Sequence, residues 1–332
     1  MKSRSQSGLT LIELMIAMLL GLLVIAAVGS MFLASSRSYR QDERVSVMSD
    51  ELRVAVGEIA RDLEMAGFWG TIIDPDALKA PPSFASFKDA VVDCDGSSPV
   101  FLDPGRPVQA INAADATAIA AVFDCISDAQ PGTGAIATNR VAGLPVALSA
   151  VKAGQGYLQT TGGEGMLYVA SADAAPPASG TGVCSDPALA SCQYWQYRPS
   201  VYYIRNWSVS AGDGIPSLCR KRLTPSAGQL RPVSECASTG IEDLHVEFGV
   251  DTDRDSSANL FTSAPTAAQM DTLNVLRVHL LARAQRGENS HTSEKTYVLG
   301  DKTVAPAMDS FYRRTASMSV VLRNPTSQRA LR

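Results

Sequence analysis

An apolar block near the N-terminus limits more than any other feature what this chain can fold into. Residues 9–33 are apolar or small, apart from the hydroxyl residues Thr10 and Ser30, and Glu13 is the only charged residue among them. A helix of about 25 residues is about 37 Å long, which is enough to cross a hydrocarbon core of about 30 Å. We therefore expect residues 9–33 to form a single membrane-spanning helix.

A cleavable secretory signal is the alternative for this block. The apolar region of such a signal is about 7 to 15 residues long and uncharged, whereas this block is longer and contains Glu13. The sequence Leu-Ala-Ser at positions 33–35 nevertheless resembles a signal cleavage site. Cleavage before Ser36 is therefore kept as the alternative.

Beyond the block, apolar residues recur in steps of three or four, which is the spacing of one helix face. These residues are Val45, Met48, Leu52, Val56, Ile59, Leu63 and the small Ala66. Most charged residues of the segment fall on other faces. We expect an amphipathic continuation of the helix over residues 34–67 that ends near Gly67 or Gly70, with a break near Ser35 and Ser36 as the alternative.

Six cysteines follow the apolar block, and none has the C-x-x-C spacing of a zinc or redox site. They are Cys94, Cys125, Cys184, Cys192, Cys219 and Cys236. Disulfides in an oxidising compartment are favoured over buried thiols in the cytosol, so the large C-terminal part is expected outside the cytoplasm. Many pairings are open, and the simplest joins neighbours: Cys94 with Cys125, Cys184 with Cys192, and Cys219 with Cys236.

The segment GLTLIEL at positions 8–14 resembles the processing signal of type IV prepilins and pseudopilins. The resemblance implies that residues 1–8 are a basic leader and that a membrane aspartic peptidase cuts between Gly8 and Leu9. The same peptidase then methylates the new N-terminus at Leu9. The usual first mature residue of the family is phenylalanine, so Leu9 puts the efficiency of processing in doubt.

Glu13 is the one charged residue of this signal and requires a partner inside the membrane. A carboxylate inside a bilayer costs a few kcal/mol and is retained only where a partner exists. The prepilin resemblance implies that Glu13 pairs with the free amine of Leu9 in a neighbouring subunit and so sets the helix register during assembly. The alternative is an unpartnered Glu13 that is neutral or snorkels to the interface.

The remainder of the chain consists of two segments that differ in composition and pattern. Residues 68–155 are rich in Ala, Pro, Gly, Ser and Asp, which predicts a loop-rich insertion held by a disulfide between Cys94 and Cys125. A short helix is expected over residues 113–122. Residues 156–332 contain several segments of strand-like alternation and are expected to form a β domain.

In the predicted strand at residues 244–250, every second residue is apolar and the residues between them are His245, Glu247 and Gly249. Similar strands are expected at residues 165–170, 200–204, 217–223, 273–282, 296–299 and 316–322. An antiparallel sheet with one covered face follows, and the long helix is the natural cover. The expected fold class is therefore α+β, with the long N-terminal helix packed on the sheet as in pilins.

Several motifs of the C-terminal half resemble the PilW family of minor pilins. They are YYI at 202–204, LCR at 218–220, GIEDL at 240–244, GVD at 249–251, VLRVHLL at 275–281, RR at 313–314 and VLRN at 321–324. The resemblance implies a low-abundance, non-enzymatic subunit of the tip complex that primes pilus polymerisation. Its partners would be the major pilin, other minor pilins, the prepilin peptidase and the inner-membrane assembly machinery.

The implied location is the inner membrane, crossed once with the C-terminal domain in the periplasm, and then the pilus. Two alternatives stay open. A minor pseudopilin of a type II secretion system has the same processing signal, and a tip adhesin or DNA-binding module would use the loop-rich insertion. Nucleic-acid binding is disfavoured because the net charge is −4 and no broad positive field exists.

Three further groups of polar residues receive weaker interpretations. Asp251, Asp253 and Asp255 begin like a calcium loop, but the EF-hand pattern fails at Ser256 and Thr262. A polar hairpin loop is favoured, with a degenerate calcium site as the alternative and no other cofactor expected. The basic run at residues 220–222 is interpreted as a solvated turn rather than a DNA or subunit contact. His245 and His279 are expected to face solvent.

Overall fold

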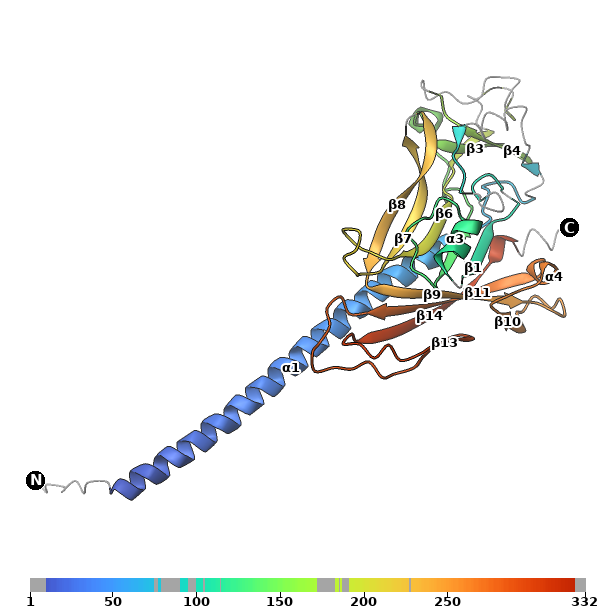
Figure 1. Ribbon diagram of the computed structural model, residues 1–332. Helices are drawn as coiled ribbons and strands as arrows, with labels where there is room; N and C mark the ends of the chain where they lie inside the picture. Colours follow the sequence, from blue (N-terminus) through green and yellow to red (C-terminus); the bar gives the residue numbers. More distant parts are fainter. Residues whose placement is uncertain are drawn as a thin grey trace, which may run out of the picture. The chain divides into compact units, whose positions relative to one another are not determined.

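The computed structural model describes residues 10–74, 77–78, 90–94, 100–103, 105–113, 115–171, 183–184, 186, 191–226 and 228–325 (Figure 1). Gly8 and Leu9 lie outside these ranges. The chain divides into two compact units, Met1–Val47 and Met48–Arg332. The helix α1, Leu11–Glu64, contributes residues to both units.

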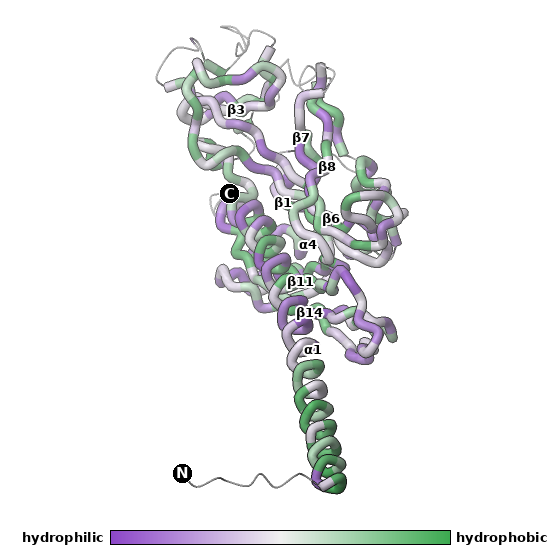
Figure 2. Tube along the Cα trace, turned by 90° about the vertical axis from the view of Figure 1, so that its left-hand side faces the viewer, coloured by the Kyte–Doolittle hydropathy of each residue, from purple (hydrophilic) through white to green (hydrophobic). Residues whose placement is uncertain are grey.

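In the first unit, α1 is a continuous helix that is apolar over residues 11–33 apart from Glu13 and Ser30. It passes through Ser35 and Ser36 without a break, so the helix predicted over the two segments is one element of 54 residues. The apolar side chains from Leu11 to Leu33 are exposed, and Figure 2 shows this part of the helix as hydrophobic. Among the described residues, α1 is the one helix long and apolar enough to cross a membrane.

The second unit contains four antiparallel sheets. Its five-stranded sheet has the order β1-β2-β6-β7-β8, and its four-stranded sheet has the order β10-β9-β11-β14. The strands of the first are Val108–Asn112, Gly134–Thr138, Ser200–Arg205, Ser217–Ser226 and Gln229–Thr239. Those of the second are Leu260–Thr262, Ile241–Val250, Leu273–Arg283 and Arg313–Val321.

Smaller elements complete this unit. A three-stranded sheet has the order β4-β3-β5 and a two-stranded sheet pairs β12 with β13. Their strands are Glu164–Val169, Gly156–Thr161, Cys192–Gln196, Tyr297–Leu299 and Lys302–Val304. The short helices are α3, Ala116–Val122, the 3₁₀ helix η2, Leu148–Ala150, and α4, Ala267–Met270.

The part of α1 within the second unit packs on both larger sheets. One apolar cluster joins helix residues such as Leu52, Ile59 and Leu63 to residues of β2, β6, β9, β11 and β14, among them Tyr202 and Leu280. Burial of apolar side chains is the main favourable term in folding. The α+β class and the helix-on-sheet packing are therefore confirmed.

The five-stranded sheet is covered on both faces, whereas one covered face was expected. Tyr202 and Ile204 of β6 belong to the cluster shared with α1. Val201 and Tyr203, the alternate residues of the same strand, belong to a second cluster with Trp69. Alternate side chains of a strand point to opposite faces, so a strand buried on both faces gives no polar and apolar alternation.

The stretch expected to be loop-rich contributes two strands to the main sheet. β1 pairs with β2, and β2 pairs with β6 through residues 135–138 and 200–203, so the boundary expected near residue 155 is crossed by sheet pairing. α3 lies in the helix expected at residues 113–122, and the Asp115 side chain caps it by accepting a hydrogen bond from the Ala118 backbone at 2.8 Å.

The helix ends three residues before the first glycine that was expected to stop it. Gly67 has φ of +73° and Gly70 has φ of +65°, a region that favours glycine. A Cβ on Gly70 would also lie 2.5 Å from the Trp195 ring. Both glycines therefore redirect the chain from α1 into the core, as the sequence indicated.

The cysteines form three disulfides: Cys94–Cys125, Cys184–Cys192 and Cys219–Cys236. This is the neighbour pairing that was the simplest of those left open. Cys219–Cys236 joins β7 to β8 near the open end of a long hairpin. The two cysteines are 17 residues apart in the sequence. Three disulfides in one chain are typical of a protein exported to an oxidising compartment.

We predict that replacing both Cys219 and Cys236 by serine lowers the free energy of unfolding by about 3 kcal/mol, because the cross-link reduces the entropy of the unfolded chain. The measurement is denaturant unfolding of the full chain in detergent under oxidising conditions. Reduction of the wild-type protein is the control, and the double variant should lose less on reduction than the wild type does.

Candidate assembly site

The N-terminal turn of α1 contains Glu13, the one acidic residue of the apolar segment at residues 9–33. Thr10 and Glu13 bond reciprocally at the start of the helix. The Glu13 Oε2 accepts hydrogen bonds from the Thr10 backbone at 2.9 Å and from its hydroxyl at 3.0 Å, and the Glu13 backbone donates to Thr10 Oγ1 at 3.3 Å. This is a capping box, which satisfies amide groups at the helix start.

The capping box gives Glu13 a local partner before any second subunit is present. A carboxylate in the apolar part of a bilayer is costly unless it is paired or hydrogen-bonded. Thr10 supplies two donors to one carboxylate oxygen. Cleavage at Gly8 and pairing of Glu13 with the Leu9 amine stay predictions.

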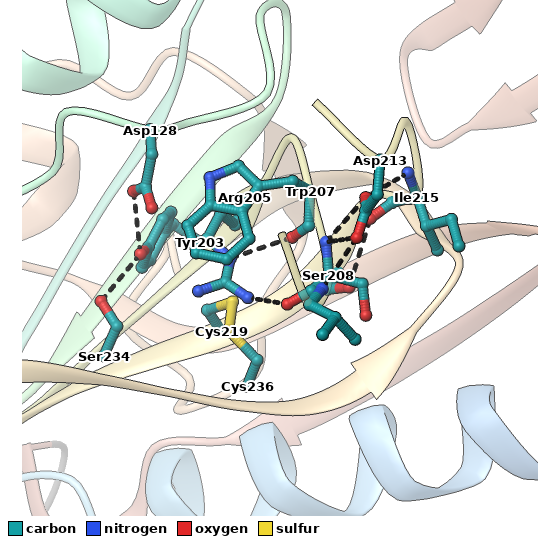
Figure 3. Close-up of a disulfide and its surroundings, with 12 residues drawn as sticks. Asp128, Tyr203, Arg205, Trp207, Ser208, Asp213, Ile215, Cys219, Ser234 and Cys236 are labelled. Atoms are coloured by element: carbon teal, nitrogen blue, oxygen red, sulfur yellow. Dashed lines mark hydrogen bonds between the residues drawn. A yellow bond between two sulfur atoms is a disulfide. The ribbon is translucent and has the colours of Figure 1, made fainter. Parts of the chain in front are cut away.

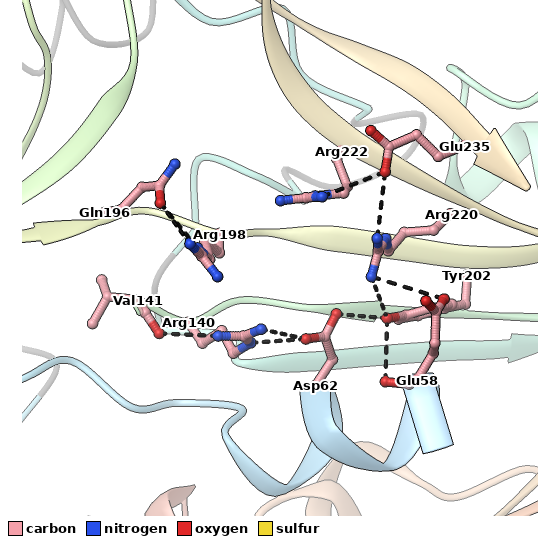
Figure 4. Close-up of polar contacts among 10 residues, drawn as sticks. All are labelled: Glu58, Asp62, Arg140, Val141, Gln196, Arg198, Tyr202, Arg220, Arg222 and Glu235. Atoms are coloured by element: carbon pink, nitrogen blue, oxygen red, sulfur yellow. Dashed lines mark hydrogen bonds and ion pairs between the residues drawn. The ribbon is translucent and has the colours of Figure 1, made fainter. Parts of the chain in front are cut away.

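Within the second unit, a buried polar network attaches α1 to the five-stranded sheet (Figure 4). The Asp62 carboxylate accepts hydrogen bonds from Arg140, at 3.0 Å from Nε and 2.5 Å from Nη2. The Tyr202 hydroxyl donates to the other Asp62 oxygen at 2.6 Å. Asp62 is only 4% exposed, so its charge is compensated by these partners rather than by water.

The network continues from the helix to the outer strands. Arg220 of β7 lies 3.9 Å from the Glu58 carboxylate and 3.3 Å from that of Glu235. Burial, together with the nearby Asp62 charge, raises the pKa of Tyr202 far above its usual range. The hydroxyl therefore remains protonated and keeps donating to Asp62. The basic run at residues 220–222 lies in β7 and not in a turn, so that prediction was wrong.

The loop after β6 is held by two residues next to the Cys219–Cys236 disulfide (Figure 3). The Arg205 guanidinium lies over the Trp207 ring at 3.4 Å and donates to the Trp207 carbonyl at 2.9 Å. The Asp213 carboxylate accepts backbone hydrogen bonds from four residues, Ser208, Val209, Ser210 and Ile215. The amide of Ile215, with help from the others, lowers the pKa of Asp213 to about 2.

The far face of the four-stranded sheet carries a buried charged cluster, where a solvated face was expected. His245 and His279 are buried. His279 Nε2 lies 2.9 Å from Glu247 Oε2, and His245 Nε2 lies 2.6 Å from Asp301 Oδ1. Lys302 of β13 lies within 2.5 Å of the buried Asp243. The prediction of outward histidines was wrong because residues 297–304 cover this face.

The acidic loop Asp251–Asp255 joins β9 to β10, as expected for a hairpin loop. Oxygens of Asp251, Asp253 and Asp255 lie within 4.8 Å of one another. Asp251 is buried, and its carboxylate accepts hydrogen bonds from the Arg254 and Ser256 backbones at 2.6 and 2.9 Å. These bonds hold the loop, and a degenerate calcium site stays the alternative to the polar hairpin loop.

Comparison with known families matches two parts of the chain. Residues 3–29 match the Prokaryotic N-terminal methylation motif, and residues 201–324 match the Type IV Pilus-assembly protein W family, PilW. No curated protein and no solved structure matches the chain. The first match covers the capping box and most of the apolar helix, and the second covers the strands from β6 to β14.

The methylation motif, the apolar helix and the antiparallel sheets define the class: this is a type IV prepilin-like protein, anchored in the inner membrane by its N-terminal helix. Within that class, residues 201–324 are similar to the PilW family of pilus-assembly proteins. Such a protein interacts with other components of the pilus. The resemblance noted in the sequence is thus confirmed.

We predict that Asp62→Ala lowers the free energy of unfolding by about 3–5 kcal/mol, because it leaves the Arg140 charge without its carboxylate in a largely buried position. Tyr202→Phe removes the hydroxyl that donates to Asp62 and is also bonded to the Glu58 carbonyl and to Arg220, and it should cost about 1.5–3 kcal/mol, the range for hydrogen bonds to charged groups. Denaturant unfolding of the full chain in detergent measures both. Glu64→Gln, at an exposed helix position, is the control and should leave the unfolding midpoint unchanged.

The lowered pKa of Asp213 predicts a pH dependence for the loop at residues 206–216. Its stabilising contribution is fully present above the ordinary value of 3.8 and is lost as pH falls through about 2. The hydrogen-exchange protection factors of the Ser208 and Val209 amides, which correct for the pH dependence of intrinsic exchange, should therefore be high at pH 5 and fall toward pH 2. Asp213→Ala should remove the protection at pH 5. Unchanged exchange in that variant would contradict the prediction.

Proposed function

We propose that this protein is a minor pilin that helps to initiate type IV pilus polymerisation as part of the complex at the pilus tip. The observation that carries the proposal is the PilW match over residues 201–324. The N-terminal signal alone is common to pilins and pseudopilins, whereas this match covers the sheet region that packs on the C-terminal part of α1. A non-catalytic, structural role goes with it.

The proposed mechanism uses the N-terminal signal in two steps. The prepilin peptidase cuts after Gly8 and methylates Leu9, which creates a cationic amine at the end of the helix. The Glu13 carboxylate then exchanges its hydrogen bonds with Thr10 for an ion pair with the amine of a neighbouring subunit. An ion pair removed from water is strongly favoured over an isolated charge, so it would fix the axial register.

The proposed partners are the major pilin, other minor pilins and the inner-membrane assembly machinery. A chromosomal deletion tests this role. In the deletion strain, the number of surface pili should fall strongly and secretion of exported enzymes should stay normal. Loss of protein secretion with normal piliation would instead identify a secretion pseudopilin and overturn the proposal.

Processing is tested by intact-mass and N-terminal analysis of the membrane protein from hosts with and without the prepilin peptidase. The proposal expects a mature chain that starts at methylated Leu9 only when the peptidase is present. Gly8→Val is the matched variant and should stay uncut in both hosts, because a side chain before the scissile bond hinders access. A start near Ser36 would indicate a secretory signal instead.

We predict that Glu13→Ala is cut and methylated normally but enters filaments about tenfold less than wild type, since a lost pairing energy of about 1.4 kcal/mol gives that factor. The measurement is quantitative mass spectrometry of sheared filaments relative to the membrane pool. Glu43→Ala, which changes an exposed acidic residue farther along α1, is the control. Equal incorporation of the Glu13 variant would contradict the pairing role.

A further inference from the structure

We propose that the outer edge of β14 binds an extended strand of a different subunit of the filament and so continues the four-stranded sheet across the subunit boundary. This inference rests on the proposed function and names a contact surface for it. The β14 strand, Arg313–Val321, is one of the two edge strands of its sheet.

The open edge is long and regular. All nine residues of β14 pair with β11 in an unbroken antiparallel register, from Arg283 opposite Arg313 to Val275 opposite Val321. In such a ladder, about half of the backbone amides and carbonyls point away from the partner strand. Within the described part of the chain, residues 314–321 make no backbone hydrogen bond or bridge on that outer side.

Four other edge strands of the unit, β4, β5, β8 and β10, are short, covered or protected. β10 has three residues. β4 and β5 each have a bridge on the outer side, from Leu78 and Val146. β8 carries Pro232, charged side chains and a bridge to Val91. Proteins use short edge strands, proline and charged residues to prevent unwanted strand pairing. The stretch of residues 315–321 in β14 is long and contains neither proline nor a charged residue.

The chemistry of the edge indicates the kind of strand that fits it. Residues 315–322 read TASMSVVL and carry no charge, and the Val321 side chain is 53% exposed. Arg314, the residue before this stretch, is exposed, and residues 323–325 after it are helical. An uncharged strand segment with an acidic residue at the end is therefore complementary to β14.

A second copy of this chain does not fit as well. The strand β14 ends at Val321 and residues 323–325 are helical, so two copies would pair through residues 313–321, which contain no carboxylate that could reach Arg314. The Arg314 guanidinium, moreover, has only a neutral partner among the described residues, the Ser49 hydroxyl at 2.8 Å. A strand of a different subunit can supply the carboxylate that would pair with Arg314, whereas β14 of a second copy cannot.

The first test blocks the edge with charge. Val321→Lys should lower co-purification of the full chain with its filament partners by about tenfold, the effect of about 1.4 kcal/mol. Val233→Lys is the matched control, because Val233 is an exposed valine, 42% accessible, on the protected edge strand β8. Both variants must keep the wild-type melting midpoint. Equal recovery of partners by the two variants would overturn the proposal.

The second test identifies the bound strand directly. A photo-crosslinking amino acid at position 321 in cells should give a discrete adduct with another filament subunit, and the same group at position 233 should not. An adduct with a second copy of this chain, or equal labelling at both positions, would contradict the inference. Arg314→Glu should weaken the adduct, and acidic residues should occur next to the cross-linked segment of the partner.

Failure of this inference can be told apart from failure of the proposed function. If the protein is processed at Leu9 and found in sheared filaments, but position 321 gives no subunit adduct, the edge contact is wrong and the pilin role remains. If the chain is absent from filaments, the proposed function itself fails. The cross-linking is therefore read together with filament content in the same cells.

Discussion

The contact between Asp62, Arg140 and Tyr202 is the interaction on which the arrangement of the second unit most depends. It places a charge of α1 inside the domain, where each polar group must find a partner. Apolar packing of Leu52 and Ile59 favours burial of the helix but tolerates small rotations and shifts. The hydrogen bonds to Asp62, at 2.5 to 3.0 Å, accept only one register of helix and sheet.

A fixed register at this point has a consequence for assembly. Tyr202 lies on β6, in the middle of the five-stranded sheet, and β6 begins the region that matches the PilW family. The cluster shared with α1 also includes Val320 of β14. The same helix face thus positions both larger sheets, so the proposed β14 contact is presented by a rigid base.

The parts that could be predicted from sequence are those governed by local pattern. The helix spacing identified Leu52, Ile59 and Leu63 as buried, and the neighbour pairing of cysteines agrees with the three disulfides. The burial of Asp62 could not be predicted from the helix spacing, because its partners Arg140 and Tyr202 lie 78 and 140 residues away in the sequence. Periodicity within the helix contains no information about such distant partners.

The strands β1 and β2 were missed for a related reason. Gly134–Thr138 is buried at every position, so it shows neither alternation nor a long apolar run, and its small residues are explained only by what lies against it. A Cβ at Gly134 would be 2.9 Å from the Leu244 carbonyl oxygen. The burial of His245 and Glu247 likewise depends on residues 297–304, which return to cover a face that seemed polar in isolation.

The N-terminal turn differs from these distant contacts, because its sequence signal is complete within a few residues. Its signal is local and specific, yet its proposed action requires a second molecule. In the single chain, the Glu13 carboxylate is satisfied by Thr10, which makes the unassembled subunit tolerable in the membrane. An exchange of the Thr10 hydrogen bonds for a stronger ion pair would favour the assembled filament. The Glu13 carboxylate would have a partner both in the single chain and in the filament. In the proposed mechanism, local capping and intersubunit pairing would be successive states of the Glu13 carboxylate.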